Sequence, residues 1–322
     1  MKHESRQDLA WALSWRLPLA LNLGATAADR QRMGALYSLD TFNSSKAHCM
    51  ETSSLAGEAL PAKEVLTYYY AKGRRVFQGS VWLRNVPGAL ANVTTELARS
   101  GANIIATSSS SIPNTDLAEW SFFAEAGVGW AGLKHTQDVL AKSPEVVKCV
   151  LKEGVDGTVV DTLHYPLRLS TGERALVIEV ATFRKMFDRI LSDFGPGGRV
   201  IIYELGLASG LESNKHFAHV LGSENIAGRV PHLVSLYTAQ GWGRVGPADG
   251  SQSKFSLQPF RGTVKIYDSF ECTGVKSEAP NSDFIRGHIE GFARALVGRQ
   301  VSCRETKCVS MGDELCQFEA SE

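Results

Sequence analysis

The order of strand-like and helix-like segments in residues 77–153 constrains the fold more than any other feature of this chain. Strands alternate apolar and polar side chains, whereas helices repeat apolar side chains every three or four residues. By these patterns the region contains a strand, a helix that Gly101 stops, two strands around a turn, and then a helix ending near Pro144 with a last strand: 77–85, 90–100, 104–112, 117–126 and 132–153. The order βαββαβ predicts an α+β sandwich, in which both helices cover one face of an antiparallel sheet.

The composition is that of a soluble globular protein without a strong charge preference. Of the 322 residues, 43% are hydrophobic and 21% are charged, which suits about two domains. Lys and Arg together number 34, as do Asp and Glu, so no net field attracts nucleic acid or anionic lipid. Six scattered cysteines are too few for a secreted disulfide scaffold, which predicts a cytoplasmic protein.

The N-terminal residues show no sustained periodicity, so residues 1–75 are interpreted as a poorly defined extension. Residues 9–28 are apolar and end in small residues, as a secretory signal peptide does, but Arg16 and Pro18 interrupt the run. The alternative is an extension translated from upstream of a true start at a later methionine. No run of 18 residues is free of charge and proline, so no membrane span is expected.

Two motifs in residues 76–155 resemble the ACT domain family: Asn85-Val86-Pro87-Gly88 between the first strand and helix, and Gly101-Ala102-Asn103-Ile104 before the second strand. In that family the strand–turn–helix junction often holds a small effector, such as an amino acid, at a subunit interface. The resemblance therefore implies a homodimer with an effector site at Asn85, Gly88 and Ala89. A helix N-terminus favours a carboxylate there, and glycine permits close approach. The alternative is that Gly88 only forms a tight turn.

A second unit is expected over residues 173–322, after a connector over residues 156–172 that glycine and proline interrupt. Its expected elements are a helix closed by Gly-Pro-Gly-Gly at 195–198, two further helices, a strand, a fourth helix and a closing hairpin: 174–194, 200–222, 232–240, 262–272, 282–298 and 301–320. Gly206 and Gly210 lie one helical turn apart, and the fourth helix repeats this spacing at Gly287 and Gly291. Small residues at this spacing predict close contact between helices.

Five landmarks in this unit occur in the order found in the 4-vinyl reductase-type domain family, which they resemble. They are Tyr203-Glu204-Leu205-Gly206, Gly241-Trp242-Gly243, Asp268-Ser269-Phe270-Glu271, Phe284-Ile285-Arg286-Gly287, and Glu305-x-x-Cys308 followed by Met311-Gly312-Asp313 and Cys316-x-Phe318. The resemblance implies a mixed α/β ligand-binding domain with an antiparallel sheet and helices around a closed apolar chamber. Members of this family include sensors of aromatic hydrocarbons.

The final hairpin carries a candidate metal site. In the sensor members of the family, a glutamate and two cysteines bind zinc with an earlier cysteine, which implies Glu305, Cys308 and Cys316 as ligands here. The earlier position holds Ser282, a poor zinc ligand because its hydroxyl is neutral. The fourth ligand is therefore open; the candidates are Asp283, His288 and Cys303. A weak or absent metal, a Cys308–Cys316 disulfide and two inert thiols remain the alternatives.

Two residues are candidates for ligand binding in the second unit. The resemblance places His232 and Trp242 in the segment that borders the effector pocket, where either can hydrogen-bond a polar head group. A satisfied core histidine and a packed indole are the alternative interpretation. His216 and His219 lie three residues apart on a helix, but no thiol or carboxylate accompanies them, so a solvated helix face is expected.

The preferred hypothesis is a non-catalytic regulatory or sensor protein that binds a hydrophobic or aromatic ligand in the C-terminal domain and a possible amino-acid-like effector at the ACT-like domain. No nucleophile–base pair, dinucleotide motif or phosphate-binding loop is evident, so no catalytic residue is assigned. No DNA-binding motif is evident either, so a regulatory signal would pass through another protein. The alternative is an enzyme or accessory protein of tetrapyrrole or hydrocarbon metabolism that reduces a vinyl group.

Overall fold

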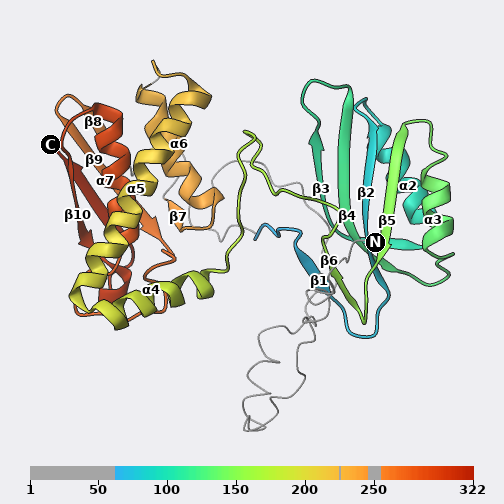
Figure 1. Cartoon of the computed structure of the whole chain (residues 1–322), viewed down its shortest axis with the longest axis horizontal. Coiled ribbons are helices and arrows are strands. Elements are labelled where there is room, and N and C mark those ends of the chain that lie inside the picture. Colours follow the sequence, from blue (N-terminus) through green and yellow to red (C-terminus); the bar gives the residue numbers. More distant parts are fainter. Residues whose placement is uncertain (1–61, 225, 246–254) are drawn as a thin grey trace, which may run out of the picture. The chain divides into compact units, whose positions relative to one another are not determined.

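The computed structural model describes residues 62–224, 226–245 and 255–322 (Figure 1). The interpretations of residues 9–28 lie outside these ranges, as does most of the extension expected over residues 1–75. None of the helices in the described ranges is both long enough and apolar enough to cross a membrane. The described chain is a mixed α+β structure with antiparallel sheets, so the predicted fold class is confirmed.

The first α+β unit has the predicted βαββαβ order. Its elements are β2 (Val76–Arg84), α2 (Ala89–Arg99), β3 (Ala102–Ser111), β4 (Leu117–Ala126), α3 (Leu133–Leu140) and β5 (Val146–Glu153). All paired strands are antiparallel in the order β3-β4-β2-β5, and α2 and α3 cover one face of the sheet (Figure 1). This is the split βαβ arrangement.

The core of this unit is apolar and lies between the sheet and its two helices. Phe77 stacks on Trp130 with ring centroids 5.2 Å apart, and Trp120 stacks on Phe122 at 4.3 Å. Leu97 of α2 is fully buried against this layer. Alternation along β2 and β4 sends every second side chain into this core, which is why the sequence pattern predicted these strands well.

A short pair of strands, β1 (Tyr68–Tyr70) and β6 (Thr158–Val160), is antiparallel and packs on the other face of the sheet. The expected connector therefore contains a strand. Beyond β6, His164 lies between two carboxylates: Nδ1 is 2.8 Å from Asp161 Oδ1 and Nε2 is 3.1 Å from Glu119 Oε1. These contacts hold the beginning of the connector against β4.

The C-terminal unit begins with three helices, α4 (Val180–Phe194), α5 (Pro196–Leu221) and α6 (Ile226–Ala239). Helix α4 starts about six residues later than the pattern predicted, because residues up to Glu179 are extended. The expected break at 195–198 is also shorter than predicted. Gly195 (φ 54°) alone separates the two helices, and Pro196 is the first residue of α5, where its missing N–H costs nothing.

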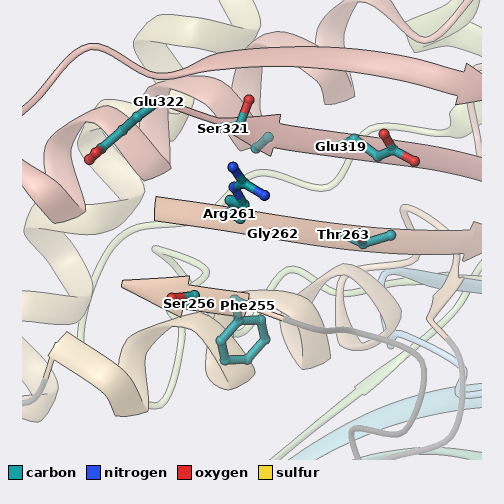
Figure 2. Close-up of a pocket in the computed structure, with 9 residues that line it drawn as sticks. Phe255, Ser256, Arg261, Gly262, Thr263, Glu319, Ser321 and Glu322 are labelled. Atoms are coloured by element: carbon teal, nitrogen blue, oxygen red, sulfur yellow. The ribbon is translucent and has the colours of Figure 1, made fainter. Parts of the chain in front are cut away.

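A five-stranded antiparallel sheet completes the unit, with the order β10-β11-β9-β7 and β8 paired to β9. The remaining elements are β7 (Arg244–Val245), β8 (Phe255–Leu257), β9 (Phe260–Tyr267), α7 (Asp283–Val297), β10 (Ser302–Lys307), the 3-10 turn η1 (Val309–Met311) and β11 (Cys316–Ser321). Helix α7 packs on the inner face of β10 and β11. On the outer face, Arg261 and Glu319 line an open polar groove of about 540 Å³ (Figure 2).

Helices α5 and α7 approach each other through the four glycines that the sequence singled out. A Cβ on Gly206 would lie 2.0 Å from the carbonyl oxygen of Phe284, and one on Gly210 would lie 2.0 Å from that of His288. Gly287 and Gly291 face the α5 backbone equally closely. The predicted helix–helix contact is confirmed, and it places α7 between α5 and the sheet, so nearly every side chain of α7 is buried.

Candidate functional site

A bulge in the final hairpin places Glu305 and Cys308 on the same side of the sheet. Side chains three residues apart on a regular strand point to opposite faces. Here the register between β10 and β11 shifts between Glu305 and Lys307, because Glu305 pairs with Phe318 and Lys307 with Gln317. The extra residue turns Cys308 back toward the interior. The odd spacing of Glu305-x-x-Cys308 is therefore the spacing that brings both side chains together.

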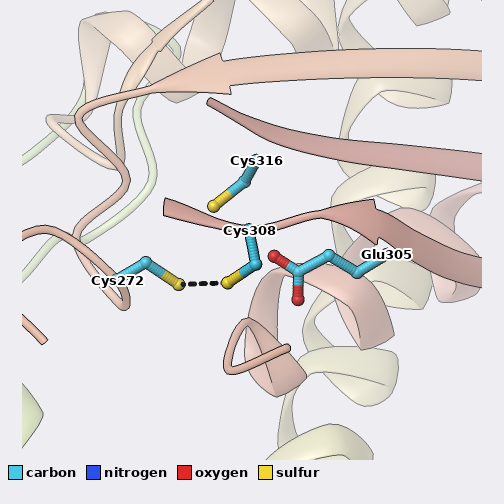
Figure 3. Close-up of side chains that lie close together, drawn as sticks. All are labelled: Cys272, Glu305, Cys308 and Cys316. Atoms are coloured by element: carbon cyan, nitrogen blue, oxygen red, sulfur yellow. Dashed lines mark hydrogen bonds between the residues drawn. The ribbon is translucent and has the colours of Figure 1, made fainter. Parts of the chain in front are cut away.

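These two side chains meet Cys272 and Cys316 in a buried cluster, here called the thiol–carboxylate centre (Figure 3). One ligand atom from each of the four residues lies within 4.8 Å of the others. The Sγ atoms of Cys272 and Cys308 are 3.5 Å apart. Cys272 comes from the turn that follows β9, so the centre joins this turn to both strands of the final hairpin.

Cys272 is the donor that the sequence analysis missed. The family position expected to hold a cysteine carries Ser282, and its hydroxyl does lie inside the centre, 3.0 Å from Cys272 Sγ and 2.8 Å from Glu305 Oε1. The thiol is thus supplied ten residues earlier in the chain. The signal was the Phe270-Glu271-Cys272 sequence, since Glu271 already belonged to a family landmark.

The three residues considered as a fourth ligand point elsewhere, so that expectation was wrong. The Asp283 carboxylate binds Arg199, with an Nε–Oδ2 distance of 3.0 Å, and also binds Arg286. His288 Nε2 lies 3.0 Å from Ser213 Oγ. Cys303 is buried on β10, where its N–H donates to Glu290. Each of them is outside the thiol–carboxylate centre.

Backbone groups around the thiols favour a negative charge on sulfur. The N–H of Asn281 donates to Cys308 Sγ at 3.4 Å, and that of Val309 donates to Cys316 Sγ at 3.5 Å. The Cys308 N–H donates to Asp313 Oδ2 at 2.8 Å, which fixes the turn after β10. The Met-Gly-Asp sequence thus shapes the turn, with Gly312 in the left-handed region (φ 103°). Such N–H donors orient and stabilise metal-binding thiolates.

The protonation of the centre favours one thiolate. Hydrogen bonding from Cys272 lowers the pKa of Cys308, while the same interaction raises the pKa of Cys272 to about 12. Burial raises the pKa of Glu305 to about 7. Without a cation, the buried cluster therefore resists holding all its donors in charged form. A bound cation reverses this balance, because it stabilises every deprotonated donor. The donor set fits a metal ion.

A second cluster, the aromatic cluster, lies beside α7 and consists of stacked and edge-on rings: Phe183, Phe187, Tyr237, Trp242, Phe270, Phe284 and the imidazole of His288. Trp242, one of the two residues expected to border a ligand, is at its centre, with its ring centroid 4.9 Å from His288 and 5.4 Å from Phe284. The structure adds His288 and Tyr237 to the predicted residues. They are joined by a hydrogen bond of 2.9 Å between Tyr237 Oη and His288 Nδ1.

The expectation of a closed chamber is not met in this structure, because the rings fill the interior themselves. The centroids of neighbouring rings lie at contact distance, for example 5.3 Å between Tyr237 and Trp242. A guest would have to separate these rings. His232 does not join them: its side chain is exposed on α6, and Nδ1 lies 2.7 Å from the carbonyl oxygen of Gly228.

The remaining predicted residues have local roles. Gly88 adopts φ 88° immediately before α2, and the Ala89 N–H donates to the Val86 carbonyl at 3.2 Å. Asn85 Nδ2 donates to Ser111 Oγ at 3.1 Å, so the junction is a hydrogen-bonded turn. His216 lies 3.3 Å from Glu173.

A comparison with family models finds a match at the end of the chain. Residues 263–322 match the 4-vinyl reductase domain. The match spans Cys272, α7 and the final hairpin, and therefore all four residues of the thiol–carboxylate centre. Trp242 and Tyr237 precede the matched residues.

Solved structures give further likenesses. The phenol-responsive sensory domain of the transcription activator PoxR, crystallised with phenol, is 21% identical over 47% of this chain and 77% of its own, with a TM-score of 0.42. A vinyl-4-reductase family protein from Methanocaldococcus jannaschii is 21% identical over 46% of this chain and 83% of its own, with a TM-score of 0.32. The regulatory subunit of aspartate kinase from Thermus thermophilus is 19% identical over 28% and 57%, with a TM-score of 0.21. No curated protein matches the chain.

Proposed function

We propose that the C-terminal unit is a non-catalytic sensor module that takes a small hydrophobic or aromatic molecule into the aromatic cluster. The observation that carries this proposal is the imidazole of His288, buried among aromatic rings with both nitrogens in hydrogen bonds to hydroxyl groups of Ser213 and Tyr237. Burial lowers the pKa of His288 to about 3, so the ring is neutral and can accept or donate one hydrogen bond to a guest.

A second polar group beside the rings supports a guest at this position. Ser269 is 0% exposed, and its Oγ has no hydrogen-bond partner among the described residues. It precedes Phe270, whose N–H donates to the Trp242 carbonyl at 2.8 Å. A buried hydroxyl without a partner is costly. A ligand carrying a hydroxyl or carbonyl group would relieve that cost.

The thiol–carboxylate centre is proposed to hold zinc through Cys272, Glu305, Cys308 and Cys316. Three thiolates and one carboxylate form a closed four-donor set, which is the composition of structural rather than catalytic zinc sites. Bound zinc would supply no chemistry to a substrate here; it would fix the turn after β9 to the final hairpin. The nearest unabsorbed base, Glu271, is already bonded to backbone N–H groups.

Three consecutive residues would connect ligand, helix and metal. Phe270 belongs to the aromatic cluster, and Cys272 belongs to the thiol–carboxylate centre. Between them, Glu271 accepts hydrogen bonds of 2.9 and 2.8 Å from the N–H groups of Phe284 and Ile285 at the start of α7. Separation of the rings by a ligand would move this segment and the start of α7 together, which is a route for signalling.

For the N-terminal unit we propose an ACT-like role as a dimerisation module. The Asn85–Gly88 junction would hold a small amino-acid-like effector, and the output would reach a separate protein in the cytoplasm. The βαββαβ order and the left-handed Gly88 before α2 support this interpretation.

The test of the sensor proposal is calorimetric titration of the full chain with 2-naphthol, a neutral aromatic probe. We expect saturable binding of one probe per chain, weakened at least tenfold by Trp242→Leu and unchanged by Trp82→Leu in the N-terminal unit. Tyr237→Phe removes one hydroxyl without removing a ring, so it is the variant of choice if Trp242→Leu does not fold. Absence of saturable binding would contradict the proposal. Turnover of a vinyl-substituted aromatic compound with a nicotinamide hydride donor would instead favour the enzyme alternative.

A further inference from the structure

The buried charge that the fold leaves least compensated is Arg229 on α6. Its side chain is 5% exposed. The guanidinium donates to two neutral oxygens: Asn214 Oδ1, at 3.0 Å, and the backbone carbonyl of Ser223. Its Nε has no hydrogen-bond partner among the described residues. The guanidinium therefore offers a free donor in the interior of the unit.

Other buried charges of this unit are paired, which makes Arg229 unusual. Glu290 binds Arg294, with an oxygen–nitrogen distance of 2.6 Å, and Asp283 binds both Arg199 and Arg286. A guanidinium stays protonated at any relevant pH, so it cannot escape the cost of burial by losing a proton. The Asn214 and Ser223 oxygens satisfy two donors, but neither carries a negative charge. The missing component is an anion.

The position of Arg229 relates it to the aromatic cluster. Arg229, Leu233 and Tyr237 are spaced by four residues, so they share one face of α6, and all three are buried. Two helical turns place Arg229 about 12 Å from Tyr237 along the axis. On α5, the consecutive residues Ser213 and Asn214 contact His288 and Arg229 respectively. The guanidinium and the Tyr237–His288 pair thus border the same interior region between α5, α6 and α7.

We infer that the ligand of the C-terminal unit is an amphipathic carboxylate, whose carboxylate binds Arg229 and whose apolar body enters the aromatic cluster. This inference rests on the sensor function proposed above and narrows its ligand class. A carboxylate matches the planar fork of a guanidinium and can accept two parallel hydrogen bonds, one of them from the free Nε. The residues between the two ends, Leu233 and Phe217 among them, are apolar, which suits an aromatic or short aliphatic body.

The test compares two probes of nearly equal shape, 2-naphthoate and 2-naphthol, by calorimetric titration of the full chain at neutral pH. We expect 2-naphthoate to bind at least tenfold more tightly. Arg229→Gln should abolish this preference while 2-naphthol still binds. The matched control is Arg189→Gln, which removes an arginine from the exposed surface of α4 and should leave the preference intact.

A second variant keeps the test decisive if Arg229→Gln does not fold. Asn214→Asp preserves the shape of the side chain and places a carboxylate against the guanidinium. It should raise the melting temperature of the ligand-free protein and abolish the preference for 2-naphthoate. A lower melting temperature together with an unchanged preference would overturn the inference, because Arg229 would then act only as a cap for the end of α5.

The outcomes separate this inference from the sensor proposal. Binding of 2-naphthol with no preference for 2-naphthoate overturns the carboxylate inference and leaves the sensor proposal standing. Binding of neither probe overturns both. A preference for 2-naphthoate that persists in Arg229→Gln overturns the inference as well, since the carboxylate would then be recognised elsewhere.

Discussion

The two halves of the described chain bury different kinds of side chain. In the N-terminal unit the buried polar residues are neutral: Gln78, Ser80, Ser100 and Thr136. In the C-terminal unit the buried set includes six ionisable side chains within the described ranges: Arg229, Glu271, Asp283, His288, Glu290 and Glu305. Both units have apolar cores with stacked aromatic rings. The difference is therefore in chemistry and not in packing.

This contrast separates a unit that folding alone explains from one that binding must help to explain. Burying an ionisable group costs free energy unless a partner compensates it. Pairing of Glu290 and Asp283 with arginines meets that cost within the chain. The thiol–carboxylate centre and Arg229 are not compensated in this way. We therefore expect perturbations of the C-terminal unit to reveal bound partners, and those of the N-terminal unit to reveal packing alone.

The largest effect is expected from Gly206→Ala, because the new Cβ would lie 2.0 Å from the Phe284 carbonyl oxygen in the contact between α5 and α7. Separating the helices should lower the free energy of unfolding by roughly 3 kcal/mol. The measurement is urea denaturation followed by circular dichroism. Gly197→Ala is the matched control in the same helix, since nothing lies within 4 Å of its Cβ position; it should change stability by less than about 1 kcal/mol. Equal effects of the two variants would contradict the observed helix contact.

Loss of metal should come next. Cys272→Ser or an excess of chelator should lower the melting temperature by several degrees, because closing a structural metal site stabilises folding. Cys308→Ser should do the same. Cys149→Ser, in β5 of the N-terminal unit, is the control and should leave the chelator response unchanged. Ser282→Ala should retain the response, since the cation would bind the thiols. A response lost in Ser282→Ala but kept in Cys272→Ser would reverse our assignment of the fourth donor.

A pH dependence should distinguish the buried imidazole. Burial lowers the pKa of His288 to about 3, below the value near 6.5 of an unfolded histidine. The unfolded chain therefore binds the proton first on acidification. The stabilising contribution is complete above pH 6.5 and falls by up to about 1.4 kcal/mol per pH unit between pH 6.5 and 3. His288→Gln should remove this slope, as measured by urea denaturation across that range.

Two carboxyl groups act in the opposite sense, so the comparison must be between variants. Burial raises the pKa of Glu271 to about 8 and that of Glu305 to about 7. Their contributions are complete below about pH 4.5 and decline as the pH rises through those folded values. His219→Gln, on the exposed surface of α5, is the control and should keep the wild-type slope. A slope that is identical in wild type and His288→Gln would show that the imidazole is not held neutral.

The smallest effect is expected in the N-terminal unit. Gly88 has φ 88° and nothing within 4 Å of its Cβ position, so Gly88→Ala meets backbone strain without a clash. The cost should be about 1 kcal/mol. Thermal denaturation should show this loss in the N-terminal unit and an unchanged chelator response. A cost as large as that of Gly206→Ala would indicate a contact that the turn geometry does not provide.

Periodicity predicted the elements because most of them bury one face against a single layer. The βαββαβ order and the glycine pairs at Gly206, Gly210, Gly287 and Gly291 followed directly from spacing. The boundaries near 174 and 195–198 were less accurate. Pattern alone does not show that residues before Val180 are extended, nor that one glycine suffices to turn the chain.

The candidate site was predictable only where its residues are close in sequence. Glu305, Cys308 and Cys316 belong to one hairpin, and the structure brings all three together. Cys272 reaches them through a turn whose geometry depends on Glu271 binding the start of α7, which spacing does not reveal. The same reason explains His288 and His232. Both are helical histidines, but only the packing of α7 between α5 and the sheet decides which one is buried.

The most direct test of the central claim, that the C-terminal unit is completed by bound partners, is native mass spectrometry of the full chain purified without added metal and then mixed with 2-naphthol. We predict one zinc ion per chain, absent in Cys272→Ser, and one further adduct of the probe mass that Trp242→Leu weakens. A chain that carries neither zinc nor probe, and whose melting curve a chelator leaves unchanged, would contradict the account.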